Sequence, residues 1–155
     1  MKNYTEKEIE KLQDSLLLIR KAGGWTAEEF GDMIGVTKQT ISNLENKKTQ
    51  MTKTQYIAIR AVLDCSIAER PNDKVLSSAV NLSLNADNLS DADIKKAQAF
   101  VEGAAKTGLD NDAFVGGLGA IIGLVAAEAL IMPLVSPIAL GAASTWLKKL
   151  LKGKK

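Results

Sequence analysis

Apolar residues recur along most of the chain at intervals of three and four residues, which is the period of an amphipathic helix. Such runs occupy residues 27–46, 72–84 and 91–107, and no stretch alternates between apolar and polar residues as a half-buried strand would. Thr26 precedes the first run and Glu29 follows three positions later, which is the spacing of a capping box at a helix start. The pattern predicts an all-α protein.

The balance of charged and apolar residues divides the chain into three predicted parts. Residues 1–66 mix charged and apolar side chains at helical spacing, and we expect them to form the first domain. Residues 67–112 are mostly small and polar, and we expect helices there that serve as a linker or a dimerisation region. Residues 113–155 begin with an apolar run that contains one charged residue, Glu128, and end in a tail with five lysines.

Residues 27–46 have the pattern of two short helices joined by a tight turn. Gly31 lies where the two helices have to approach closely, and Gly35 lies at the turn, where the backbone often needs a positive φ. Five apolar residues are expected to pack between the helices: Phe30, Ile34, Val36, Ile41 and Leu44. The other face of the second helix carries side chains suited to reading base edges: Thr37, Lys38, Gln39, Ser42 and Asn43.

Basic residues on and after this second helix predict a modest surface for DNA phosphates. Five of them outnumber one acidic residue, Glu45; the five are Lys38, Lys47, Lys48, Lys53 and Arg60. The base-reading face and the basic residues together predict double-stranded DNA as the partner, with Lys53 among the phosphate contacts.

The stretch IRKAGGWTAEEFGDMIGVTKQTISNLENKK resembles the helix-turn-helix of the phage Cro/CI-type repressors, the XRE family, over about residues 12–65. The resemblance implies a five-helix bundle whose third helix enters the major groove. It also implies roles for individual residues: base contacts from Lys38, Gln39 and Asn43, phosphate contacts from Thr26, Asn46 and Lys48, and a structural ion pair between Arg20 and Glu45 that ties the first helix to the end of the recognition helix.

The chain departs from the usual family pattern in three places. Ala27 stands where the family usually has a glutamine that contacts phosphate, Lys47 stands where it often has a glycine, and the loop at Gln50 and Met51 is less basic than in a typical member. These departures predict weak phosphate binding, so that a homo-oligomer, a dimer or a larger assembly, would be needed for useful affinity at physiological salt.

The apolar run at 113–147 is long enough to predict contact with a membrane. Residues 114–132 provide 19 positions, close to the number that a helix needs to span a bilayer. Pro133 and Pro137 then interrupt the run, so that a second and shorter helix is expected at 138–151. The segment is therefore predicted to form an apolar, Gly-rich helical hairpin.

Individual residues of this segment fit a hairpin that is bound to lipid or tightly packed. Small residues that allow close helix packing recur every four positions, at Gly119, Gly123 and Ala127. Trp146 and the lysines after it resemble an interfacial anchor with a cytoplasmic tail, while Glu128 is costly in lipid unless it is paired or protonated. Since the DNA-binding part and the basic tail both belong in the cytoplasm, we expect the protein at the inner face of the cell membrane.

The composition excludes several catalytic chemistries. The 155 residues contain no histidine and one cysteine, so His-containing triads, His-ligated zinc sites and an internal disulfide are impossible. Cys65 is expected to be a small buried residue. Asp91 and Asp93 are better explained as favourable charges at a helix N-terminus than as metal ligands. No catalytic residue, metal or cofactor is predicted.

The main hypothesis is thus an oligomeric, membrane-associated transcriptional regulator of the XRE type. Two other classes stay open. In one, the C-terminal segment acts as a pore or a scaffold, and the helix-turn-helix serves as a sensor or tether. In the other, the protein is an antitoxin-like regulator whose apolar segment is covered by a protein partner. The apolar segment could also form the core of a soluble oligomer.

Overall fold

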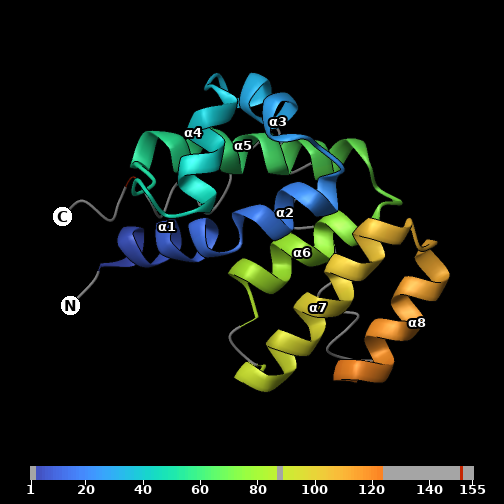
Figure 1. Cartoon of the computed structure of the whole chain (residues 1–155). Coiled ribbons are helices and arrows are strands. Elements are labelled where there is room, and N and C mark those ends of the chain that lie inside the picture. Colours follow the sequence, from blue (N-terminus) through green and yellow to red (C-terminus); the bar gives the residue numbers. More distant parts are fainter. Residues whose placement is uncertain (1–2, 87–88, 124–150, 152–155) are drawn as a thin grey trace.

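The computed structural model describes residues 3–86, 89–123 and 151. Every regular element among them is a helix, which confirms the predicted all-α class. The helices are α1 (Tyr4–Asp14), α2 (Leu16–Gly23), α3 (Ala27–Ile34), α4 (Lys38–Glu45), α5 (Lys53–Glu69), α6 (Lys74–Leu84), α7 (Asp91–Thr107) and α8 (Asn111–Ile122). Figure 1 shows α1 and α2 running between two groups of helices, with α3, α4 and α5 on one side and α6, α7 and α8 on the other.

Side-chain caps define where the helices begin. The Thr26 hydroxyl accepts a hydrogen bond from the backbone N–H of Glu29 at 3.0 Å, and the Glu29 carboxylate accepts one from the N–H of Thr26 at 3.2 Å. This is the capping box that the sequence predicts at the start of α3. Ser90 caps α7 in a similar way by accepting from the N–H of Asp93 at 3.2 Å.

Helix α6 lies at the centre of the second group of helices. Nine of its 11 residues are buried, and it contacts α1, α2, α5, α7 and α8. A helix surrounded in this way needs apolar or small residues on all sides, and the buried positions of KVLSSAVNLSL meet that condition except for the polar residue Asn81. The region after α5 therefore packs directly against α1 and α2.

Helix α8 takes up the first part of the apolar run. It ends at Ile122, because Gly123 adopts φ 91° and ψ 144°, outside the helical region and in a range that glycine tolerates best. The continuous helix predicted over 114–132 is therefore wrong. Phe114 and Leu118 are fully buried, and the Phe114 ring stacks on Phe100 with centroids 5.4 Å apart. This part of the run belongs to the protein core.

The other residues singled out in the C-terminal segment lie at the end of α8 or outside the described residues. Gly119 lies within α8 and Gly123 ends it, so this pair of small residues covers only the last turn of the helix. The turn of the predicted hairpin falls outside the described residues, as do five predicted positions: Ala127, Glu128, Pro133, Pro137 and Trp146. Among the described residues, no helix has the length and apolar character needed to cross a membrane.

We predict that truncating Phe114 destabilises the whole protein, because its ring fills the core between α8 and α7. Phe114→Ala should lower the free energy of unfolding by about 3–5 kcal/mol, measured by urea denaturation followed by circular dichroism. The matched control is Leu109→Ala, because Leu109 is 36% exposed, and this change should cost less than about 1 kcal/mol. Equal effects of the two substitutions would contradict the placement of α8 in the core.

Candidate nucleic-acid interface

Helices α3 and α4 approach closely because α3 has a glycine at the contact. A Cβ atom placed on Gly31 would lie only 2.6 Å from the backbone carbonyl oxygen of Val36. The carbonyl of Gly31 accepts hydrogen bonds from the N–H groups of Gly35 and Val36 at 2.8 and 2.9 Å. Gly35 has φ 95°, so the turn uses the left-handed region as expected. The backbone of these residues therefore sets how α4 is held against α3.

The apolar residues predicted to pack between these helices do turn inward. Phe30, Ile41 and Leu44 are fully buried, while Ile34 and Val36 are half-buried. Two of the buried residues, Ile41 and Leu44, come from α4, which has only eight residues. The opposite surface of α4 is therefore free of any role in the core.

The residues proposed to contact bases lie on that opposite surface. Thr37 caps α4 by accepting from the N–H of Thr40 at 3.1 Å. Thr37, Lys38 and Gln39 are exposed, and Ser42 and Asn43 are half-buried. The Gln39 amide nitrogen donates to the side-chain oxygen of Asn43 at 3.0 Å. The structure thus gathers these five side chains at the first two turns of one helix.

The residues proposed to contact phosphate lie at the ends of helices on either side of α4. Thr26 is the cap of α3, Asn46 ends α4, and Lys53 begins α5. Lys48 is exposed in the loop after α4. The Asn46 amide donates to the Ser42 hydroxyl at 3.3 Å.

Two residues of α5, Arg60 and Cys65, lie in surroundings that differ from those predicted. Arg60 is only 5% exposed, and its guanidinium donates to the Tyr56 hydroxyl at 2.9 Å, so it does not belong to the phosphate-binding surface. Cys65, which we expected to be buried, is exposed. Both results follow from the orientation of α5, which turns one face inward with Tyr56, Ile59, Arg60, Leu63, Asp64 and Ile67.

An ion pair fixes the C-terminal end of α4 to α2. The Arg20 guanidinium binds both carboxylate oxygens of Glu45, with Nε–Oε2 and Nη2–Oε1 distances of 2.6 and 3.0 Å. Its third nitrogen donates to the backbone carbonyl of Trp25 at 3.0 Å. A bidentate contact of this kind restricts the relative orientation of the two side chains as well as their distance. One side chain therefore joins α2, the turn before α3 and the end of α4.

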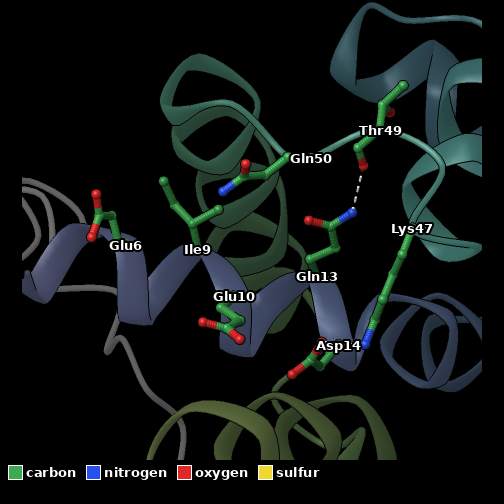
Figure 2. Close-up of a pocket in the computed structure, with 8 residues that line it drawn as sticks. All are labelled: Glu6, Ile9, Glu10, Gln13, Asp14, Lys47, Thr49 and Gln50. Carbon is green, nitrogen blue, oxygen red and sulfur yellow. Dashed lines mark hydrogen bonds and ion pairs between the residues drawn. The ribbon is translucent and has the colours of Figure 1, made fainter. Parts of the chain in front are cut away.

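A second side chain at this end of α4 is one that the sequence did not reveal. Gln13 of α1 is 8% exposed, and its amide nitrogen donates to the carbonyls of Leu44 and Thr49 at 3.0 and 2.8 Å. Its amide oxygen accepts from the N–H of Met51 at 2.9 Å. Figure 2 shows Gln13 reaching from α1 to the loop after α4. A single amide thus satisfies three backbone groups that are distant in sequence.

The loop after α4 begins with a residue in the left-handed region. Lys47 has φ 59° and is the one non-glycine residue with positive φ among those described. Its N–H donates to Leu44 at 3.2 Å, and the next N–H, that of Lys48, donates to Asn43 at 2.9 Å, which is a Schellman motif. This geometry explains why glycine is common at the position of Lys47 in the family that the sequence resembles.

The Lys47 side chain turns toward α1. Its amine lies 2.6 Å from a carboxylate oxygen of Asp14, and this hydrogen bond, together with the charge of Asp14, raises the pKa of the Lys47 amine above its usual value. The pair lies at the edge of a groove of about 420 Å³ between α1 and the loop, which Figure 2 shows. The groove is lined by Glu6, Ile9, Glu10, Gln13, Asp14, Lys47, Thr49 and Gln50.

Comparison with known proteins agrees with this geometry. Residues 16–70 match a family model described as Helix-turn-helix. This segment is an XRE-type helix-turn-helix domain. It comprises α2 to α5, so α4 is the third helix of the domain and occupies the place of the recognition helix. Helix α1 precedes the matched segment, and α6, α7 and α8 follow it.

Two curated relatives match over part of the chain. The chain is 35% identical over 57 residues to Antitoxin HipB of Escherichia coli strain K12, covering 37% of this chain and 65% of that protein. It is 33% identical over 57 residues to Antitoxin HipB of Escherichia coli O6:H1, covering 37% of this chain and 61% of that protein. The match thus spans less than two thirds of the length of these relatives. No solved structure matches the chain significantly.

We predict that replacing Gln13 by leucine destabilises the protein despite the increase in apolar volume. Gln13→Leu removes the partners of three backbone groups at the end of α4 and in the loop. The free energy of unfolding should fall by about 1–3 kcal/mol, measured by urea denaturation. Gln50→Leu is the matched control, because Gln50 is exposed in the same loop. If both substitutions gave the same result, the hydrogen bonds of Gln13 would not be what holds the loop.

Proposed function

We propose that the protein is a sequence-specific, DNA-binding transcriptional regulator that acts as a repressor. The observation that carries the proposal is the exposed surface of α4, which presents Lys38, Gln39 and Asn43 from the recognition position of an XRE-type domain. Side chains of these types match the donors and acceptors on base edges in the major groove. Bound at an operator, such a protein would block access by occupying the site.

The contact between Gln39 and Asn43 supports a more specific proposal about the base that is read. The hydrogen bond to Asn43 uses one of the two N–H donors of the Gln39 amide. The second N–H and the amide oxygen remain for the N7 acceptor and the N6 donor of adenine, the pairing that glutamine favours. We therefore propose adenine opposite Gln39, with Lys38 nearby as a donor to guanine.

The contacts to phosphate would come from the helix ends around α4. Thr26, Asn46, Lys48 and Lys53 supply hydroxyl, amide and ammonium donors, but only two of them carry a charge. Since non-specific affinity depends mainly on the number of cations at phosphates, one domain would bind weakly. We therefore propose a homo-oligomer on DNA in the cytoplasm, in which two or more domains bind adjacent half-sites.

A second candidate is an antitoxin-like regulator, in which the same domain binds DNA and another part of the chain binds a toxin. The two relatives named as antitoxins favour it. It predicts that a gene next to the one for this protein encodes a product that arrests bacterial growth when expressed alone, and that co-expression of this protein restores growth. If cells that express each neighbouring gene in the absence of this protein grew normally, the antitoxin-like function would be excluded.

For the main proposal, we expect Gln39→Ala to weaken binding to a selected operator about 5- to 150-fold and to relax sequence preference at one base pair. The operator would first be selected from random duplexes with the full chain, and affinity would then be measured by fluorescence anisotropy at fixed salt. Gln50→Ala is the control, because it removes an exposed amide that does not lie on α4. Unchanged selectivity of Gln39→Ala would refute the role of this surface.

A further inference from the structure

The ion pair between Lys47 and Asp14 joins the loop after the recognition helix to α1, a helix that precedes the segment matched by the family model. Lys47 belongs to the loop that follows the recognition helix, and Asp14 is the last residue of α1, which precedes the matched segment. The two charged atoms are 2.6 Å apart, yet the side chains remain 61% and 50% exposed. A solvent-exposed ion pair contributes little free energy, so its lysine can leave the carboxylate and bind another anion such as a phosphate group.

Lys47 lies between two of the residues proposed to contact phosphate, Asn46 and Lys48. Its backbone is in the left-handed region, and Figure 2 shows its side chain extending from the loop to the end of α1. The loop thus contains two adjacent lysines, of which one is bound by a carboxylate of the protein. A lysine in this loop would otherwise be close enough to the recognition helix to serve as a phosphate contact.

Other acidic residues of α1 add to the attraction of the Lys47 amine toward this helix. Glu6, Glu10 and Asp14 line the same groove, spaced one turn apart on α1, and Glu10 adds to the electrostatic attraction on the Lys47 amine. This acidic side of α1 attracts the lysine and repels a phosphate group approaching the same loop. Both effects act in the direction of weaker DNA binding.

We propose that Asp14 withholds Lys47 from DNA phosphate, so that α1 reduces the affinity of the domain for DNA of any sequence. This inference rests on the proposed function. Phosphate contacts carry no sequence information, whereas base contacts do. Withholding one phosphate contact therefore lowers specific and non-specific binding by about the same factor, while the base contacts of α4 are kept.

The test compares four forms of the full chain: wild type, Asp14→Asn, Lys47→Gln and the double variant. Binding to a duplex of random sequence would be measured by anisotropy over a series of KCl concentrations. We expect Asp14→Asn to bind about two- to fivefold more tightly, with a slope of log K against log salt that is steeper by about 0.9, the value for one added phosphate contact. The double variant should bind like the wild type, and Lys47→Gln should bind no more tightly than the wild type, because it leaves the Asp14 carboxylate without its partner.

Two further measurements test whether the gain in DNA affinity of Asp14→Asn comes from loss of the ion pair or from the lower negative charge of α1. Glu10→Gln removes the same charge from the same groove but leaves the ion pair, and it should not change the salt slope. A nuclear magnetic resonance titration of Lys47 should show that its pKa falls toward the usual value in Asp14→Asn, which tests the pair without DNA.

The possible outcomes are distinct. If Asp14→Asn gains affinity and the gain persists in the double variant, a general charge effect accounts for it and the inference is overturned. If the wild type binds duplex DNA and Asp14→Asn binds no better, the inference fails while the proposed function stands. If no form binds duplex DNA, both are overturned.

Discussion

The position of the recognition helix depends on a buried amide that the helix-turn-helix itself does not contain. An eight-residue helix is not stable alone, and the last carbonyls of such a helix need partners from elsewhere. Gln13 provides one partner at Leu44 and holds the loop that follows. The Arg20–Glu45 ion pair restrains the same end of α4 from α2, and the contact at Gly31 restrains its start. α4 is therefore fixed at both ends by groups that face away from its exposed surface.

Helix α1 links this arrangement to the rest of the molecule. On one side it supplies Gln13 and Asp14 to the end of α4 and the loop, and on its other side it contacts α6. Because α6 is enclosed by its neighbours, its position depends on α7 and α8 as well. The helices beyond the DNA-binding domain thus form part of the support on which the recognition helix rests.

Most features that the sequence predicted are determined by residues close together in the chain, whereas the Arg20–Glu45 pair, which joins residues 25 positions apart, was predicted from the family resemblance. The capping box at Thr26, the close approach at Gly31 and the turn at Gly35 depend on neighbours within a few positions, and so the type and place of α3 and α4 could be foreseen. The role of Gln13 could not, since its three partners lie more than thirty positions away in the sequence. The burial of Arg60 escaped prediction for a similar reason, because a charge count cannot tell which face of α5 turns inward. The first part of the apolar run forms α8, which packs on the protein through Phe114 and Leu118, and the sequence of an apolar helix does not tell whether it packs on protein or on lipid.

The hydrogen bond between Gln39 and Asn43 has a consequence for how such a protein can change its target. The outward side chains of α4 contribute nothing to the core, so a mutation there carries little penalty for folding. The two amides hold each other, however, and replacing one leaves the other with a different orientation as well as a missing neighbour. If Gln39 and Asn43 read bases as proposed, a change of operator requires both residues to change together, because each substitution alone also alters the setting of the other amide.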